Sequence, residues 1–210
     1  MVIMNKKAIA LGSSVLLSIS LLAAPASAHH PNGSEIPSNF VQGFLSGIGH
    51  PVIGIDHLVF VVAIGLLAAL SKKLGRFIPV TFVVATAIGT AIYLQNIDLP
   101  VPELIISASV LVMGIFLARE KQVNWATITA IGAIAGIFHG YAYGESIVGA
   151  ETTALGAYLL GFCSIQLAIS AIACYVGRSI IQTPTSISLC FAGFTISGIR
   201  FAFASNAILS

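Results

Sequence analysis

The feature that most constrains this chain is a series of long apolar stretches separated by short polar turns. About twenty apolar residues match the thickness of a bilayer core, and a segment that crosses lipid must pair its own backbone groups as a helix. Such stretches lie at about 51–70, 77–94, 103–118, 125–140, 152–176 and 186–207. The sequence therefore predicts an all-α, polytopic membrane protein with six transmembrane helices.

Composition supports this class and excludes others. The 210 residues are 57% hydrophobic and only 8% charged, with a mean hydropathy of +1.01, which is typical of a membrane protein. A net charge of +2 gives no electrostatic basis for nucleic-acid binding. Cys163, Cys174 and Cys190 lie in apolar runs with the spacing of neither a zinc site nor a redox pair, which indicates packing residues.

The first 28 residues have the three parts of a secretory signal peptide. Lys6 and Lys7 precede an apolar core at 8–22, and Ala26-Ser27-Ala28 has the pattern of a cleavage site. We expect cleavage there, which leaves one transmembrane domain at 29–210 with its N-terminus on the outer face of a bacterial cytoplasmic membrane. The alternative is an uncleaved first span.

The loop charges predict the same orientation. In a six-span chain that starts outside, the outer turns contain Asp98, Glu145 and Glu151 but no lysine or arginine. The expected cytoplasmic loops contain Lys72, Lys73, Arg76, Arg119, Lys121 and Arg178. Positive charge is retained on the cytoplasmic side of membrane proteins, so this asymmetry agrees with the signal peptide.

A cluster of polar residues stands at the mouth of the first long stretch, in the sequence His50-Pro51-Val52-Ile53-Gly54-Ile55-Asp56-His57. Residues 40–49 are too few to span and predict a re-entrant or interfacial piece. Because Pro51 suits the first position of a helix, we expect a helix from there, with His50 and His57 on one face two turns apart. Ionisable groups are costly in hydrocarbon, so Asp56 and His57 are predicted to be functional.

Other polar groups are expected at the same depth. Glu103 starts the third stretch, His139 lies near the end of the fourth, and Glu145 follows it. Imidazoles and carboxylates without a thiol suit divalent nickel, cobalt or zinc. The candidate metal ligands are therefore His50, Asp56, His57, Glu103, His139 and Glu145. Three alternatives stay open: a hydrogen-bonded core role for His139, a helix-dipole role for Glu103, and an exposed turn position for Glu145.

Glycine recurs every four residues around His139, at Gly132, Gly136, Gly140 and Gly144. Such a bare stripe allows another helix to approach closely, and we expect it to bring the fourth span near the first. Arg200, inside the sixth stretch, requires a partner or a water-filled cavity unless it reaches the interface.

These motifs resemble the HupE/UreJ family, membrane proteins that are encoded beside hydrogenase and urease genes and regarded as nickel or cobalt permeases. The resemblance rests on His29-His30-Pro31, on His50-Pro51-x2-Gly54-x-Asp56-His57, and on Phe138-His139-Gly140-Tyr141-Ala142. It covers essentially the whole mature chain. It implies metal-handling roles for His50, Asp56, His57, Glu103 and His139. The chain departs from many members at Tyr143, where they carry a second histidine, and in the placement of Glu145 directly after Gly144.

The resemblance and the polar cluster predict a secondary permease for Ni²⁺ or Co²⁺ rather than an enzyme. Its expected partners are the transported ion, the bilayer and a further copy of the chain, with no bound cofactor and no nucleic acid. Two alternatives stay open. One is a zinc-dependent intramembrane hydrolase with Glu103 as its base. The other is a metal-binding accessory protein for metalloenzyme maturation that does not transport.

Overall fold

The computed structural model describes residues 36–71, 74–118 and 124–181, and in these segments it contains helices and no strands. The helices are α2 (Phe40–Ile53), α3 (Ile55–Leu70), α4 (Phe77–Leu94), α5 (Pro102–Ala118), α6 (Trp125–Glu145) and α7 (Thr152–Ile181). The prediction of an all-α chain is thus confirmed for the described part. The expected signal peptide, the stretch at 186–207, Cys190 and Arg200 lie outside the described residues.

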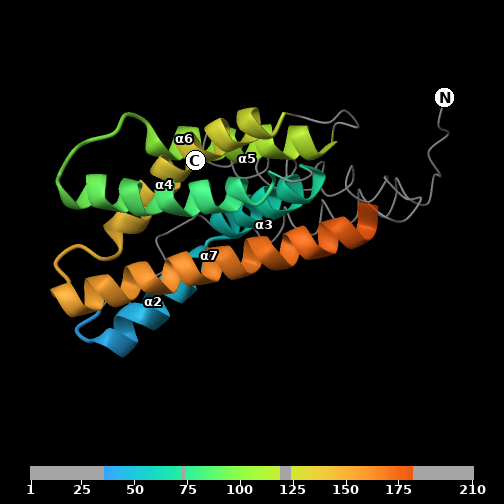
Figure 1. Ribbon diagram of the computed structural model, residues 1–210. Coiled ribbons are helices and arrows are strands. Elements are labelled where there is room, and N and C mark those ends of the chain that lie inside the picture. The colour runs from blue at the N-terminus through green and yellow to red at the C-terminus, as the bar shows by residue number, and fades with distance from the viewer. Residues whose placement is uncertain (1–35, 72–73, 119–123, 182–210) are drawn as a thin grey trace, which may run out of the picture.

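The helices form a bundle with α3 near its centre. Figure 1 shows α4, α5 and α6 on one side of α3, with α7 and α2 together on the other. Among the described helices, α4, α6 and α7 are long and apolar enough to cross a membrane. The α2–α3 pair is a fourth candidate if it counts as one broken span, and α5 is apolar but shorter, with 17 residues. Several membrane-length helices make this a multi-pass membrane protein.

Two helices extend beyond their expected ends. The sequence predicts that the fourth stretch ends at Gly140, but α6 continues to Glu145. The helix continues because a side chain at Gly144 would meet the Tyr93 ring, which shows that α4 still packs against α6 at this turn. α7 passes Gly177 and ends at Ile181, because that glycine packs on Leu66 and Ala69 of α3.

The prediction that a helix begins at Pro51 is wrong. Pro51 lies inside α2, and Gly54 separates α2 from α3 with a bend of 80° between them. Gly54 is extended, with φ −70° and ψ 102°, and its N–H donates to the His50 carbonyl. The His57 N–H donates to the Asp56 carboxylate at 3.0 Å instead of continuing a helical ladder from α2. His50 and His57 therefore lie on two helices and not on one face of a single helix.

Glycines allow three helix pairs to pack backbone against backbone: α4–α6, α2–α7 and α3–α7, where a methyl group on Gly65 would overlap the Ser170 backbone. In the α4–α6 pair, a methyl group on Gly140 would overlap the Thr86 backbone, and the Thr90 hydroxyl donates to the Gly140 carbonyl at 2.8 Å. In the α2–α7 pair, a methyl group on Gly47 would overlap the Tyr158 backbone. The glycine stripe of α6 thus faces mainly α4. The sequence predicts that the stripe faces the first span, but among its four glycines only Gly132 approaches α3, at Ile64.

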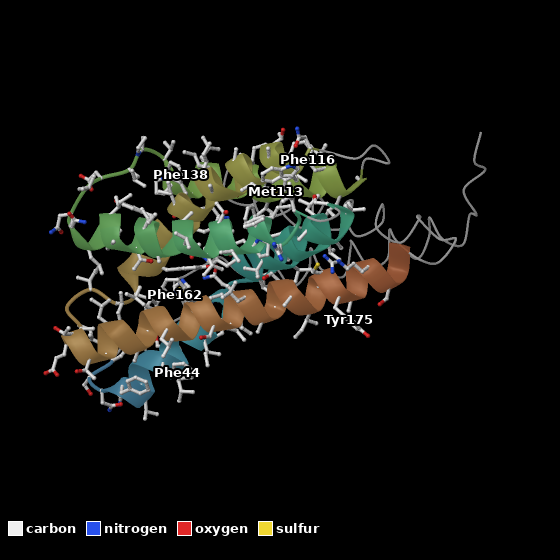
Figure 2. The ribbon with its side chains drawn as sticks, viewed as in Figure 1. Phe44, Met113, Phe116, Phe138, Phe162 and Tyr175 are labelled. Atoms are coloured by element: carbon white, nitrogen blue, oxygen red, sulfur yellow. The ribbon has the colours of Figure 1, made fainter. Side chains whose placement is uncertain are left out.

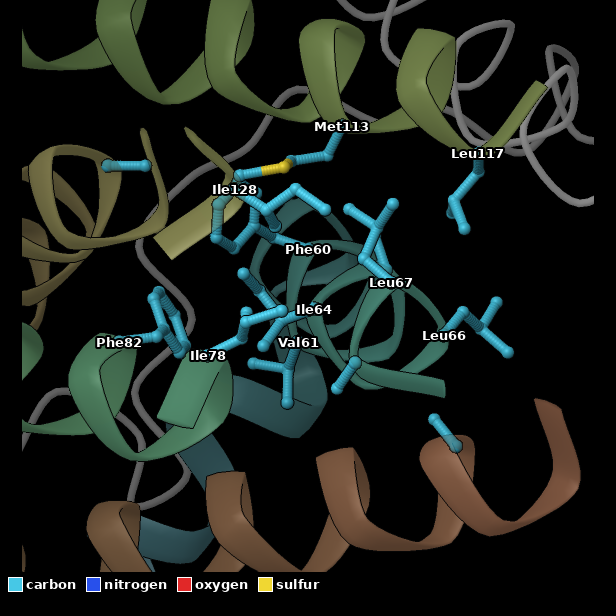
Figure 3. Close-up of a cluster of buried hydrophobic side chains, with 14 of the residues drawn as sticks. Phe60, Val61, Ile64, Leu66, Leu67, Ile78, Phe82, Met113, Leu117 and Ile128 are labelled. Atoms are coloured by element: carbon cyan, nitrogen blue, oxygen red, sulfur yellow. The ribbon is translucent and has the colours of Figure 1, made fainter. Parts of the chain in front are cut away.

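The apolar core fills the space between α3 and its neighbours. Figure 3 shows the buried side chains that meet there, among them Phe60, Ile64 and Leu67 of α3, Ile78 and Phe82 of α4, Met113 and Leu117 of α5, and Ile128 of α6. Cys163 and Cys174 pack against this cluster as free thiols, which confirms the packing role expected for them. On the outside of the bundle, apolar side chains project away from the helices, as Tyr175 does on α7 with 75% exposure (Figure 2).

The α4–α6 contact predicts a strong effect of a single methyl group. Gly140→Ala should lower the free energy of unfolding by about 1–3 kcal/mol, because the Thr86 backbone cannot move aside as a side chain would. The measurement is unfolding of the full chain in detergent micelles. Gly156→Ala is the matched control, because a methyl group there meets nothing within 4 Å. Equal stability of the two variants would contradict the close packing described here.

Candidate metal centre

Three histidines from three helices converge at one end of the bundle. His50 is in the last turn of α2, His57 in the first turn of α3, and His139 in the second half of α6. The His57 ring centroid lies 5.6 Å from that of His50 and 5.0 Å from that of His139. His57 and His139 are buried, with 8% and 0% exposure, and His50 is half-buried.

The helix break at Gly54 places the first two rings. A Cβ at Gly54 would lie 2.7 Å from the His57 ring and 3.5 Å from an Asp56 carboxylate oxygen. The absence of a side chain at residue 54 therefore lets the His57 ring fold back beside the break. Since α2 and α3 bend by 80° there, the rings of His50 and His57 meet although they belong to different helices.

The contact between His57 and His139 joins α3 to α6. Their Nδ1 atoms are 2.9 Å apart, a hydrogen-bond distance in which one nitrogen carries the hydrogen and the other accepts it. The rings of Phe60 and Phe82 lie beside His139, with centroids 4.4 Å and 6.1 Å away. The imidazole pair is therefore held on the border of the apolar core.

Ser109 of α5 decides which nitrogen of His139 carries the hydrogen. The Ser109 hydroxyl donates to the Ile106 carbonyl at 2.7 Å, so its oxygen is left to accept from His139 Nε2 at 3.2 Å. His139 is then the Nε2–H tautomer, and its Nδ1 presents a lone pair to His57. Partners that fix the tautomer in this way are usual for histidines that bind metals.

His50 belongs to a second hydrogen-bonded chain. Its Nδ1 lies 2.9 Å from the Ser146 hydroxyl, which is 3.0 Å from the Tyr158 hydroxyl. The Tyr158 hydroxyl in turn donates to the Tyr143 carbonyl at 3.0 Å. These contacts connect α2, the end of α6 and α7, and they fix the edge of the His50 ring.

Tyr143 is the residue whose importance the sequence alone did not reveal. The sequence marks it only as a departure from the family pattern. In the structure it is fully buried, and its ring centroid lies 4.9 Å from that of His50 and 4.7 Å from that of His57. Its hydroxyl has no hydrogen-bond partner in the described part of the chain. The sequence feature that could have indicated its role is a tyrosine hydroxyl in an apolar helix, one turn after His139.

The carboxylates are less buried than the histidines. Asp56 is half-buried beside His57, whereas Glu103 at the start of α5 and Glu145 at the end of α6 are exposed. Within the described segments, no set of three or more His, Cys, Asp or Glu side chains has the geometry of an assembled metal site. The structure thus brings the histidines together and leaves both glutamates at the surface.

The spacing of the His57 and His139 nitrogens is also that of two ligands on one ion. Two nitrogens about 2.1 Å from a metal are about 3.0 Å apart at a right angle and about 3.4 Å apart at a tetrahedral angle. The observed 2.9 Å is a hydrogen-bond distance, and it is close enough to these values for one ion to take the place of the shared hydrogen.

Comparison with known proteins gives one consistent result. The family model described as "HupE / UreJ protein" matches residues 17–203. The chain is similar to "Protein HupE" of Rhizobium leguminosarum bv. viciae, with 30% identity over 133 residues that cover 63% of this chain and 67% of that protein. No solved structure matches the chain.

The two buried tyrosines of the centre predict stability changes of opposite sign. Tyr143→Phe should raise the free energy of unfolding of the metal-free protein by about 1–3 kcal/mol, because it removes a buried hydroxyl without a partner. Tyr158→Phe should lower it by about 1–2 kcal/mol, because two hydrogen bonds are lost. Unfolding in detergent measures both, and a loss of stability in both variants would show that the Tyr143 hydroxyl has a partner after all.

Proposed function

This chain belongs to the HupE/UreJ family, and from that premise we propose that it is a secondary permease that imports Ni²⁺ or Co²⁺ across the bacterial cytoplasmic membrane. The family comprises membrane proteins linked to nickel and cobalt handling for hydrogenase and urease, and it is not a family of enzymes. The hydrolase alternative is therefore not retained. The step from metal handling to import is the proposal.

The observation that carries the proposal is the contact between His57 and His139. Two buried imidazoles from different helices face each other through Nδ1 atoms 2.9 Å apart. An ion that entered between them would replace the shared hydrogen, which would move to another atom of His57. A dication would then be held by side chains of α3 and α6, and its release would restore the hydrogen bond.

The remaining ligands would come from the residues around this pair. His50 approaches from α2, Asp56 supplies the nearest carboxylate, and the Tyr143 hydroxyl has no partner in the described residues. A hydroxyl in that position would donate to a water or carboxylate in the ion's shell. Glu103 and Glu145 are exposed at helix ends on the same side of the bundle, where they would attract a cation before it enters.

We propose that this end of the bundle faces the outside. The turns near it contain Asp98, Glu145 and Glu151, whereas Arg76 and Arg178 lie at the opposite helix ends. Retention of positive charge in the cytoplasm supports this orientation. The first step of import would then be the exchange of hydration water for imidazole and carboxylate ligands at the outer face.

Uptake of radioactive nickel and cobalt at sub-micromolar concentrations tests the function. Cells that lack their own uptake systems should accumulate metal with the intact chain, and lose nearly all of this uptake with His57→Ala or Asp56→Ala. Glu151→Gln is the matched control, because Glu151 is exposed in a turn and should be dispensable.

Each variant must be compared at equal membrane abundance. Metal accumulation that is unchanged in His57→Ala would contradict the proposed site. Absence of accumulation by the intact chain, with metal bound by the purified protein, would indicate an accessory protein in place of a permease.

Ser109 should influence metal affinity without touching the ion. Ser109→Ala removes the acceptor that keeps His139 in its Nε2–H tautomer, so Ni²⁺ affinity should fall by about tenfold. Equilibrium dialysis of the purified chain measures this affinity. Ser107→Ala is the control, because the Ser107 hydroxyl bonds only its own helix in the described structure, at the Glu103 carbonyl. An affinity equal in both variants would show that the tautomer of His139 is fixed by other contacts.

A further inference from the structure

Outside the histidine cluster, a buried polar pair connects α4 and α7. Thr86 and Gln166 both have 0% exposure, and the Thr86 hydroxyl oxygen lies 3.5 Å from Gln166 Oε1. Gln166 Nε2 is buried and has no hydrogen-bond partner in the described residues. A primary amide in the middle of an apolar bundle is thus left half satisfied.

The hydrogen-bonding pattern favours the reversed orientation of this amide. The Thr86 hydroxyl already donates to the Val83 carbonyl at 2.7 Å, so its oxygen needs a donor and not a second oxygen beside it. Rotation of the Gln166 amide by half a turn places Nε2 next to Thr86, and the nitrogen and oxygen of an amide are assigned by such networks. The atom that then has no partner within the described segments is the Gln166 carbonyl oxygen, and an amide oxygen can bind a divalent cation.

The pair lies at the depth of His139 and about one turn deeper than His57 along the bundle. A methyl group on Gly65 of α3 would overlap the Ser170 backbone of α7, so these two residues lie at one level. Four residues earlier on each helix, Gln166 lies level with Val61, which is one turn after His57. The Thr86 backbone contacts Gly140, the neighbour of His139. One turn further along α3, the space is filled by the apolar cluster around Ile64 and Leu67 (Figure 3).

We propose that the Gln166 carbonyl oxygen, oriented by Thr86, is a second and weaker station for the transported dication. It would take the partly hydrated ion from the imidazoles before the ion passes the apolar cluster. A neutral oxygen holds nickel or cobalt less firmly than imidazole does, as release requires. This inference rests on the proposed transport function and adds to it the next ligand on the path.

Uptake and binding together test the station. Gln166→Leu should leave Ni²⁺ affinity of the purified full chain within about twofold of the wild type, and lower nickel uptake by about tenfold or more. Ser170→Ala is the matched control. Ser170 is buried one turn further along α7, and its hydroxyl donates within its own helix to the Leu167 carbonyl. Both quantities should stay at the wild-type value in that variant.

Two results with Gln166→Leu would overturn the inference while the permease proposal stands. One is uptake equal to that of the wild type. The other is a loss of affinity as large as that of His57→Ala, which would make Gln166 part of the first site. Failure of the wild type itself to take up nickel would overturn both proposals, so the two failures are distinguishable.

A second variant covers the case in which Gln166 only holds α4 and α7 together. Gln166→Glu keeps the size and an acceptor oxygen, and it adds a negative charge at the proposed station. The purified variant should bind one more equivalent of Ni²⁺ than the wild type and should take nickel up more slowly. Binding of the wild-type number of ions with wild-type uptake would overturn the station even if Gln166→Leu does not fold.

Discussion

The close approach of α6 to α4 at Gly140 is the constraint on which the centre depends. Because Gly140 has no side chain, its backbone packs directly on that of Thr86. The Thr90 hydroxyl of α4 also donates a hydrogen bond to the Gly140 carbonyl. His139 is the preceding residue, so this contact sets how far its ring reaches toward α3 and α5. A bulkier residue at 140 would move α6 outward and separate His139 from both His57 and Ser109. Packing energy at the glycine therefore maintains the geometry of the imidazole pair.

The break at Gly54 contributes an electrostatic element that side chains alone do not supply. α2 ends at Ile53 and α3 begins at Ile55, so the negative end of one helix dipole and the first turn of the next meet beside His50 and His57. Among the last carbonyls of α2, that of His50 accepts from the Gly54 N–H, and a helix end leaves the carbonyls after it without helical donors. Interrupted helices with free carbonyls are a recurrent means of holding cations inside membrane proteins. In the proposed permease, the α2 carbonyls would favour a cation at the break, and the Asp56 carboxylate would offset the positive first turn of α3.

The sequence predicted the elements better than it predicted their contacts. The range 77–94 is the range of α4, and the convergence of His50, His57 and His139 was expected from their common depth. The break at Gly54 is not predicted, because Pro51 favours a helix start in the sequence, whereas α2 accommodates it in its last turn. The sequence also does not predict which helix covers the glycine stripe. Nor does it predict that the Tyr143 hydroxyl and one end of the Gln166 amide lack hydrogen-bond partners in the described residues. Periodicity shows which face of a helix is bare but not which neighbour will cover it.

The glycine contacts also divide the bundle into two stiff units. α4 and α6 touch backbone to backbone, as do α2 and α7, and α3 joins the second unit, because Gly65 rests on the Ser170 backbone of α7. Side chains fill the space between α3 and the α4–α6 unit. Stiff units of this kind move by tilting, and packed side chains between them can rearrange more easily than touching backbones. His139 belongs to the α4–α6 unit, whereas His50 and His57 belong to the unit of α2, α3 and α7. A tilt of the α4–α6 unit against the other helices would therefore separate His139 from His57 and leave His50 beside His57.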